Sequence, residues 1–403
     1  MKQKQQTYQA EMIQHLYYGG SLSCAELSDL SEKSLPLTMQ TLNKLLDQGL
    51  VQETGLATST GGRRPQTYSL QADKMFIVGV AMDQMSTRIS LLDLENNEVV
   101  PPVEQTLLIV QNDNALEELG TILKNFLKLV GTYRERIIGI GIGMPGFVDQ
   151  ARGINHSFLH TEHGNITSYL GQVTHLPVFI DNDSSLVALA EYKFGAARGS
   201  NNVMVVNLGW GTGLGMIVDK HLFRGHSGFA GEFSHIPLFT NNKLCSCGKI
   251  GCLETEASLK VIFQKIVESI TGGAATSIRN LSVNDINQAI STILQAAVSG
   301  DRLAVSVLAE VAYNVGRGIA ILIHIMNPDR VILSGNGASA GNLWLAPVFQ
   351  AINENCIPKI SENTTVAVSK LGKKAEIIGA AALVIENMHR LHHSKILATP
   401  AHA

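Results

Sequence analysis

The sequence has few cysteines and lacks both a long apolar run and an apolar N-terminus. Five cysteines in 403 residues are too few for a secreted fold held together by disulfides. No run of about 18 uncharged apolar residues occurs, and the N-terminal segment MKQKQQTYQAEM lacks the apolar core of a secretion signal. These absences lead us to expect a cytoplasmic protein with no membrane insertion.

Charge of either sign is also scarce. Charged residues make up 16% of the chain and the formal net charge is −3, so no global electrostatic attraction to nucleic acid exists. Any affinity for DNA must come from a local motif. At 403 residues and 45% hydrophobic content, the chain is too long for one core and is expected to form several domains.

Residues 1–72 predict a separate small domain, because they contain few glycines and show helical periodicity. YQAEMIQHLYYGG predicts a first helix that ends at Gly19-Gly20. In the following SCAELSDLS, Ser23 is the expected N-cap of a second helix and Glu26 its capping-box partner. The segment LVQETG and the segment QTYSLQ predict the two strands of a wing.

A third helix, at roughly 36–47, is the candidate recognition helix of a helix-turn-helix. Apolar residues recur at helical spacing at Met39, Leu42, Leu45, Leu46 and Leu50. The side chains expected off this stripe carry donors and acceptors suited to phosphates or base edges: Thr38, Gln40, Thr41 and Lys44. A three-helix protein-interaction module is the alternative.

The expected wing tip, LATSTGGRRP, carries the other candidate DNA contacts. Arg63 and Arg64 follow two glycines and precede a proline, an arrangement suited to entering a narrow minor groove. Residues 1–70 hold six basic and six acidic side chains, so the DNA hypothesis depends on the placement of these arginines. A solvated wing tip is the alternative.

From about residue 75 the pattern predicts an α/β fold with two lobes of similar texture. Short buried strands bounded by glycine alternate with helical stretches: FIVGVAM, RISLLDLE, IIGIGIGMPG, PVFIDND and NVMVVNLGWGTGLGMIV are the expected strands. The predicted first lobe covers 73–195 and is joined by a C-terminal helix at 376–395. The predicted second lobe covers 196–375 and includes the cysteine-rich loop and dimerisation helices.

Three of the five cysteines fall within eight positions. Cys245, Cys247 and Cys252 have the spacing C-x-C-x4-C, with Gly248 and Gly251 available for tight turns. Three thiolates need a fourth ligand to close a tetrahedral site, and His235 is the nearest candidate. The spacing predicts structural zinc (Zn²⁺), with free buried thiols as the alternative.

Two glutamates, Glu232 and Glu254, bracket this loop. A rigid pair of carboxylates suits a hydroxyl-rich ligand, because each hydroxyl donates one hydrogen bond and a carboxylate accepts two or more. Taken singly, either glutamate is more typical of a solvated surface. Asp183 follows a predicted strand and opens a helix, so it is either a base for a hydroxyl nucleophile or the N-cap of that helix.

These motifs, taken in order, resemble the ROK family of bacterial sugar kinases and sugar-responsive repressors. The resemblance rests on GMPGFVD, FIDND, LGWGTGLG, GFAGEFSH, CSCGKIGCLE and MNPDRVILSGNG. The N-terminal segment that ends in GGRRP is similar to the helix-turn-helix of the repressor branch. The resemblance implies a winged helix-turn-helix followed by a two-lobed actin/hexokinase-like (ribonuclease H-like) domain.

The resemblance also implies site residues. The implied sugar contacts are Asn182, Asp183, Glu232, His235 and Glu254, and the implied zinc ligands are His235, Cys245, Cys247 and Cys252. His235 is expected to face the sugar with one ring nitrogen and the metal with the other.

Three departures separate the chain from the kinases of the family. MDQMST keeps Asp83 but places Met85 and Ser86 where kinases carry glycines that admit ATP phosphates. Trp210 stands where kinases carry a small hydroxyl residue, and Ser234 replaces the glycine of Glu-x-Gly-His, a milder change. The sequence therefore indicates an intact sugar pocket beside an altered nucleotide pocket.

Two functions remain in view. The preferred one is a sugar-responsive transcriptional regulator, a repressor of carbohydrate uptake or metabolism genes. Its expected partners are operator DNA, a small sugar or sugar-phosphate effector, and further copies of the chain in a homodimer or higher homo-oligomer. The alternative is an ATP-dependent sugar kinase with Asp183 as general base.

Overall fold

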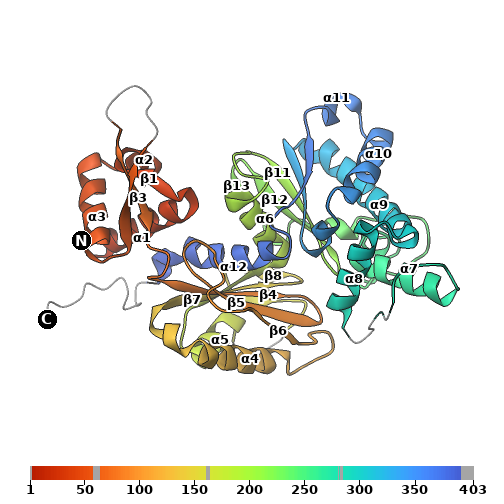
Figure 1. Ribbon diagram of the computed structural model, residues 1–403, viewed down its shortest axis with the longest axis horizontal. Helices are drawn as coiled ribbons and strands as arrows, with labels where there is room; N and C mark the ends of the chain where they lie inside the picture. Colours follow the sequence, from red (N-terminus) through yellow and green to blue (C-terminus); the bar gives the residue numbers. More distant parts are fainter. Residues whose placement is uncertain (1, 58–63, 160–163, 280, 282–284, 392–403) are drawn as a thin grey trace. The chain divides into compact units, whose positions relative to one another are not determined.

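The computed structural model describes residues 2–57, 64–159, 164–279, 281 and 285–391 (Figure 1). By its internal contacts the chain divides into two compact units. The first contains residues 1–181 and the segment from Ala380 onward, and the second runs from Asn182 to Gly379. A winged-helix domain and one α/β sheet belong to the first unit, and another α/β sheet forms the second. The predicted α/β fold class with an N-terminal helix-turn-helix is confirmed.

The N-terminal domain pairs three helices with a three-stranded sheet. Its elements are α1 (Lys2–Gly19), β1 (Ser21–Ser23), α2 (Cys24–Leu30), α3 (Leu35–Asp47), β2 (Val51–Leu56) and β3 (Gln66–Leu70), with the strand order β1-β3-β2. Ser23 caps α2 and exchanges hydrogen bonds with Glu26, as the capping box predicted. The end of the first helix, the third helix at the predicted position and both wing strands are confirmed. Strand β1 was not predicted, because its three residues are too short to show alternation.

The first unit also contains a five-stranded sheet with the order β10-β7-β4-β5-β6. Its strands are β4 (Phe76–Met82), β5 (Ser86–Leu92), β6 (Val103–Thr106), β7 (Ile137–Met144) and β10 (Val178–Asn182). Helices α4 (Ala115–Leu129) and α5 (Ile166–Thr174) lie on one face and α12 (Lys374–Glu386) on the other (Figure 1). A short ribbon of β8 (Val148–Asp149) and β9 (Ile154–Asn155) follows β7.

A close backbone approach fixes α12 on this sheet. A Cβ atom at Gly141 would lie 1.9 Å from the carbonyl oxygen of Ala380, so only glycine in β7 lets the helix pack at this distance. The run IIGIGIGM is accordingly buried at all eight positions.

The second unit is built on the sheet order β13-β12-β11-β14-β15. Its strands are β11 (Val203–Leu208), β12 (Thr212–Val218), β13 (His221–Leu222), β14 (Arg330–Ser334) and β15 (Thr365–Val368). Its other helices are α6 (Asp183–Phe194), α7 (Leu259–Thr271), α8 (Ile286–Val298), α9 (Arg302–Met326), α10 (Leu345–Asn355) and α11 (Pro358–Ser361). Alternate residues of β11 face two different cores: Met204 and Val206 pack with α7–α9, whereas Val203 and Val205 pack with α6.

Helix α6 lies with the second unit, not with the first lobe where the boundary at residues 195–196 placed it. It packs against β11 and β12, where a Cβ atom at Gly215 would lie 2.3 Å from the Ser184 carbonyl oxygen. Sequence periodicity cannot reveal this contact between helix and strand. It indicates that a helix exists but not the sheet against which the helix packs.

Helix α9 is long and apolar enough to span a bilayer by length and composition alone. In the structure, 67% of its most apolar window is buried inside the protein. Its buried residues include Val311, Val315 and Ile319, which pack in the core of the second unit. Helix α9 is therefore a core helix.

Asp301 holds the loop before α8 to the start of α9. Its carboxylate accepts the Ala304 amide at 3.0 Å as an N-cap, and it accepts hydrogen bonds from Thr276 and Ser277 at 2.6–2.8 Å. We expect Asp301→Ala to lower the free energy of unfolding by about 1–2 kcal/mol at pH 7, measured by urea denaturation. Asp301→Asn keeps an acceptor at the cap and should lose less.

The loss of stability in Asp301→Ala should become smaller as the pH falls. Partial burial opposes ionisation, but the hydrogen bonds from Ala304 and Ser277 outweigh it and lower the pKa of Asp301 below its ordinary value. The stabilisation is then complete above the unfolded-state pKa near 4 and is lost as the pH falls below it. The difference between wild type and Asp301→Ala should shrink between about pH 6 and pH 3. A difference that stays constant over this range contradicts the assignment.

Candidate functional site

The predicted metal ligands come together in the second unit. His235, Cys245, Cys247 and Cys252 each offer one ligand atom, and these atoms lie within 4.8 Å of one another. Cys245 and Cys252 are buried, whereas Cys247 is exposed. Burial, followed by hydrogen bonding to the neighbouring thiols, raises the pKa of Cys252 to about 12. A cation bound among these sulfur atoms would reverse this shift by stabilising the thiolate.

Glycines and backbone hydrogen bonds shape the loop that carries the cysteines. Gly248 and Gly251 have φ angles of 80° and 77°, in the left-handed region that favours glycine. A Cβ atom at Gly251 would lie 2.0 Å from the Phe239 carbonyl oxygen, which is too close for any residue except glycine. The Cys245 amide donates to the Lys249 carbonyl at 2.8 Å and closes the turn. The spacing predicted these turns correctly.

A second tie in this loop was missed by sequence reasoning. Glu256 is only 7% exposed. Its carboxylate forms an ion pair with Lys243 at 2.6 Å and accepts a hydrogen bond from the Asn241 side chain. Its carbonyl oxygen accepts from Asn314 of α9 at 3.2 Å. These contacts anchor both ends of the cysteine loop to the body of the unit. No spacing rule marks Lys243 and Glu256 as partners, because they are thirteen residues apart in irregular chain.

Asn182, not Asp183, caps helix α6. The Asn182 side-chain oxygen accepts the Ser184 and Ser185 amides at 3.0 and 3.2 Å. Asp183 accepts the Ser184 amide at 2.7 Å with one oxygen, and its other oxygen lies 3.4 Å from Asn207 Nδ2. The N-cap interpretation of Asp183 is therefore wrong. Buried Asn207, which the sequence analysis did not select, also donates to Ser184 Oγ at 3.1 Å and orients this end of α6.

His235 connects the carboxylates to the cysteine cluster. Its Nδ1 lies 3.5 Å from Cys245 Sγ, and its Nε2 lies 3.7 Å from Glu232 Oε2. Burial lowers the pKa of His235, which favours the neutral imidazole that ligates metals. The two ring nitrogens thus face two different neighbours. Burial, and then the charge of Asp183, raises the pKa of Glu232, so these two carboxyl groups lie close enough to interact.

Glu254 is the most strongly perturbed carboxyl group of the site. Burial raises its pKa to about 7, although the Thr212 amide, which donates to its Oε2 at 3.0 Å, opposes the shift. A carboxyl group with this pKa is present in both protonation states near neutral pH, so it can donate or accept a hydrogen bond. Asp183, Glu232 and Glu254 together form an acidic group in which Asp183 and Glu254 are half-buried and the Glu232 side chain is 42% exposed, so its oxygens are open to a hydroxyl-rich ligand.

The glycine-rich turn between β11 and β12 is occupied by protein groups. Leu259 and Lys260, at the start of α7, donate their amides to the Gly209 and Trp210 carbonyl oxygens at 3.3 and 3.2 Å. The Trp210 ring lies 6.0 Å from the Phe263 ring, at an interplanar angle of 56°. The amides of the turn itself also have partners: the Gly209 amide donates to the Gly211 carbonyl and the Thr212 amide to Glu254 Oε2, both at 3.0 Å. These backbone donors, which would bind a phosphate, are thus engaged within the chain.

The equivalent turn of the first unit is closed locally. Asp83 accepts the Met85 and Ser86 amides, both at 2.7 Å, and the Ser86 hydroxyl at 3.1 Å. The sequence predicted that side chains replace glycines here. The structure adds that the Asp83 carboxylate accepts hydrogen bonds from the backbone amides of the same turn.

The structure corrects two predicted DNA contacts on α3. Thr38 and Thr41 are fully buried, and Thr38 Oγ1 lies 2.7 Å from Tyr8 Oη of α1. Thr41 donates to the Leu37 carbonyl at 3.0 Å. The prediction that these threonines lie off the buried stripe is wrong, because their methyl groups fill the core while their hydroxyls bond locally.

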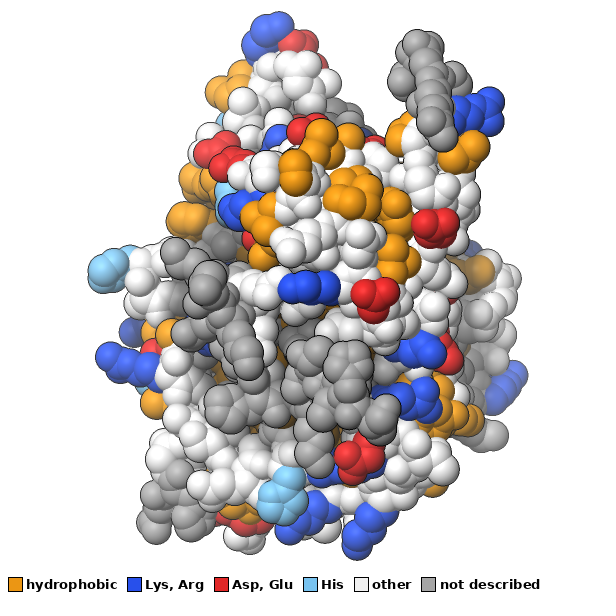
Figure 2. Space-filling model, turned by 90° about the vertical axis from the view of Figure 1, so that its left-hand side faces the viewer, with side chains coloured by type: hydrophobic (Ala, Val, Ile, Leu, Met, Phe, Trp, Pro, Cys, Tyr) orange, Lys and Arg blue, Asp and Glu red, His pale blue; other side chains and the backbone are white. Residues whose placement is uncertain are grey.

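The remaining predicted DNA contacts differ in their surroundings. Gln40 and Arg64 are exposed, Lys44 is half-buried, and Arg63 lies outside the described residues. Met39, which was predicted to be buried, is 38% exposed. Figure 2 shows hydrophobic side chains gathered at the surface on the face it displays.

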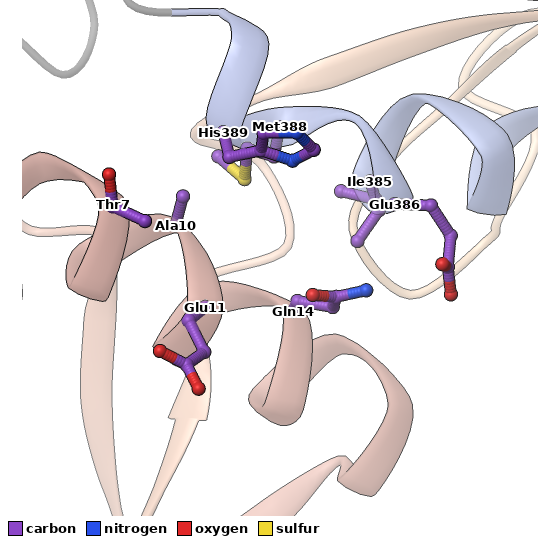
Figure 3. A pocket seen from close by; sticks show the side chains of 8 residues that line it. All are labelled: Thr7, Ala10, Glu11, Gln14, Ile385, Glu386, Met388 and His389. Carbon is purple, nitrogen blue, oxygen red and sulfur yellow. The ribbon is translucent and has the colours of Figure 1, made fainter. Parts of the chain in front are cut away.

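A separate pocket in the first unit contains none of the predicted site residues (Figure 3). Its lining comes from α1 and from the end of α12 with the turn after it: Thr7, Ala10, Glu11, Gln14, Ile385, Glu386, Met388 and His389. At its edge Tyr18 donates to Glu386 at 3.0 Å, and burial raises the pKa of Tyr18 well above its ordinary value. No sequence pattern marks this pocket, since the residues on its two sides lie more than 370 positions apart.

Comparison with known proteins identifies relatives over nearly the whole chain. A model described as the ROK family matches residues 96–387. A xylose repressor from Caldicellulosiruptor bescii is 30% identical and covers 91% of this chain and 92% of its own length. The DNA-binding transcriptional dual regulator NagC of Escherichia coli K12 is 28% identical, over 91% of this chain and 89% of its own length.

Solved structures give the same result. A ROK family transcriptional regulator, described as a homolog of the E. coli MLC protein, matches with a TM-score of 0.77 at 25% identity and covers 98% of this chain and 99% of its own. A ROK glucokinase from Streptomyces griseus has a TM-score of 0.63 at 26% identity but covers 76% of this chain. The chain is thus similar to regulators over its whole length and to kinases over part of it. The protein belongs to the ROK family.

Proposed function

We propose that this protein is a sugar-responsive, DNA-binding regulator that represses genes of carbohydrate uptake or metabolism. The observation that carries the proposal is the position of His235, whose two ring nitrogens lie beside Glu232 and Cys245. This side chain joins an acidic ligand site to a metal-type cluster, in a chain that also carries a winged helix-turn-helix.

A sugar fits the acidic group of the second unit. Asp183, Glu232 and Glu254 present carboxyl oxygens that accept hydrogen bonds from hydroxyl groups, and Asn182 adds an amide at the start of α6. The named relatives support a carbohydrate effector, since one is a xylose repressor and another is an N-acetylglucosamine repressor. Because their sugars differ, the effector of this protein is left as a small sugar or sugar phosphate.

Structural zinc fits the cluster. Three thiolates and one imidazole are the donor set that Zn²⁺ takes in closed tetrahedral sites, and their ligand atoms already lie within 4.8 Å of one another. His235, Cys245, Cys247 and Cys252 would hold the ion. Bound zinc would fix the His235 ring through Nδ1, so that Nε2 stays directed at the acidic group.

Regulation is better supported than phosphoryl transfer. Relatives and solved structures that cover nearly the whole chain are regulators, whereas the kinase match leaves part of the chain uncovered. Among the described residues, backbone amides in both turns where a nucleotide would bind already donate within the chain: Gly209 and Thr212 in one turn, Met85 and Ser86 in the other. Asp183 then serves as a hydrogen-bond acceptor for the sugar.

We expect a cytoplasmic homodimer or higher oligomer that binds two half-sites of an operator. A helix-turn-helix domain inserts one recognition helix for each half-site, so a dimer sets their spacing. A sugar changes DNA affinity only if it binds two arrangements of the protein unequally.

The test is fluorescence anisotropy of labelled duplexes from the region upstream of the protein's own gene. Protein is titrated at fixed salt, first alone and then with xylose, glucose, N-acetylglucosamine and their phosphates. Binding well above that of a scrambled duplex, shifted by one of these sugars, is the expected result. Equal binding to both duplexes in all conditions, together with sugar-dependent ATP turnover, would establish the kinase alternative instead.

Cys247 offers a clean test of the metal site, because it is exposed and its removal leaves no core cavity. We expect Cys247→Ser to lose stoichiometric zinc, since three ligands no longer close the shell. Metal content is measured by mass spectrometry of the purified protein. The control is Cys24→Ser, at a thiol outside the cluster, which should keep one zinc per chain. Retention of zinc by Cys247→Ser contradicts the four-ligand assignment.

Asp183→Asn tests the acidic group without disturbing the cap of α6, because Asn182 makes that cap. Loss of a charged acceptor should weaken binding of the effector sugar by about 10- to 100-fold. Isothermal titration calorimetry measures the affinity, and circular dichroism checks the fold. The matched control is Glu362→Gln, a surface carboxylate paired only with Lys359 among its described contacts. Unchanged sugar affinity in Asp183→Asn would remove this residue from the site.

A further inference from the structure

The solvent face of α3 is defined by a different set of residues from the one the sequence indicated. Pro36, Met39, Gln40, Asn43 and Asp47 are all exposed and recur every three or four residues, so they form one face of the helix. The opposite face is buried and consists of Thr38, Thr41, Leu42 and Leu45. Any macromolecule that binds along α3 therefore meets the first set.

The polar side chains at the centre of this face have open hydrogen-bonding groups. Within the described part of the chain, the Gln40 and Asn43 amides make no hydrogen bond. They lie three residues apart, on adjacent turns, and Met39 stands beside them with 38% of its surface exposed. Leu35 and Leu37, in the first turn of α3, are also exposed, at 53% and 40%.

The chemistry of this face matches one pair of bases. Glutamine and asparagine amides form paired hydrogen bonds with N6 and N7 of adenine, and an apolar side chain contacts the methyl group of thymine. Reading guanine requires arginine or lysine at O6 and N7. Between positions 36 and 43 the helix has no basic residue, and Lys44 is half-buried at the border of the face.

Other groups of the domain suit phosphates and carry no base information. The N-cap Ser34 makes no side-chain cap hydrogen bond, so the start of α3 offers backbone amides to a phosphate. Lys44 and the exposed Arg64 add positive charge. Asp47 lies about 6 Å further along the axis than Asn43, beyond the N-terminal half of the helix that enters a groove.

We propose that Met39, Gln40 and Asn43 read A·T base pairs in the major groove of each half-site. Gln40 and Asn43 pair with adenine, and Met39 packs on a thymine methyl group. This inference rests on the proposed DNA-binding function, and it identifies which bases the operator presents to α3.

The first experiment identifies the sequence without assuming an operator. Full-length protein selects duplexes from a library with a random 30-base-pair centre, and the enriched sequences are aligned. We expect half-sites whose major-groove contacts, mapped by uracil interference at thymines and by methylation interference at guanine N7, fall on A·T pairs. Enrichment of G·C pairs at those positions overturns the A·T readout but leaves DNA binding standing. No enrichment of any sequence overturns the DNA-binding function and the readout together.

The second experiment removes single methyl groups from the selected duplex. Replacing thymine by uracil at one position deletes only the C5 methyl, and it should weaken wild-type binding about fourfold at the position that Met39 contacts. Met39→Ala should bind the thymine and uracil duplexes equally. Uracil substitution that has no effect at any position, or the same effect in Met39→Ala, contradicts the role of Met39.

The amides are tested by base substitution. For wild type, changing the contacted A·T pair to G·C should cost roughly 5- to 150-fold in affinity. Gln40→Ala and Asn43→Ala should each lose most of this discrimination at one position and keep it at the other. The matched control is Gln295→Ala, an exposed amide on α8, which should discriminate like wild type. Thermal melting confirms that each variant is folded. Full discrimination in both α3 variants overturns the proposal.

Discussion

The arrangement of the candidate site depends on one irregular loop, the loop that carries the cysteines. This loop brings the His235 imidazole and three thiol groups within 4.8 Å of one another. The loop can close because Gly251 has no Cβ atom, where one would lie 2.0 Å from the Phe239 carbonyl oxygen. Lys243 and Glu256 then hold the loop ends with an ion pair at 2.6 Å. Backbone hydrogen bonds from the Cys245, Gly248 and Gly251 amides complete the loop, and a bound metal would stabilise it further.

The acidic group beside this loop, formed by Asp183, Glu232 and Glu254, destabilises the folded protein. Partial burial raises the pKa values of both glutamates, that of Glu254 to about 7, and the charge of Asp183 adds to the shift of Glu232. A ligand that donates hydrogen bonds to these carboxyl groups would offset the repulsion between them. Hydroxyl groups of a sugar do so by donating hydrogen bonds to the carboxylates. The same carboxylates repel a phosphate, so any phosphorylated effector must direct its phosphate away from them.

The N-terminal domain divides its polar residues between core and surface. Thr38 and Thr41 use their hydroxyls inside the domain and contribute methyl groups to its core. Gln40 and Asn43, on the other face, keep their amides at the surface. Because the domain is nearly neutral, affinity for DNA depends on a few placed groups, and long-range attraction contributes little.

The sequence by itself determined the α/β class, the winged helix-turn-helix and the ligand atoms of the cysteine cluster. Each of these depends on local spacing: helical periodicity, the Ser23 capping box and the C-x-C-x4-C pattern. The resemblance to the ROK kinases, and not spacing, implied that Met85 and Trp210 stand where those kinases carry small residues.

Only the tertiary structure decided which side chains those elements expose and which partners they meet. Threonine is compatible with either face of a helix, so the burial of Thr38 became apparent only with Tyr8 packed against it. The assignment of α6 to the second unit depends on close approach at Gly215. Asn207, Lys243 and Glu256 act through contacts between residues distant in sequence. Such contacts leave no periodic trace, because packing joins segments whose separation along the chain is arbitrary.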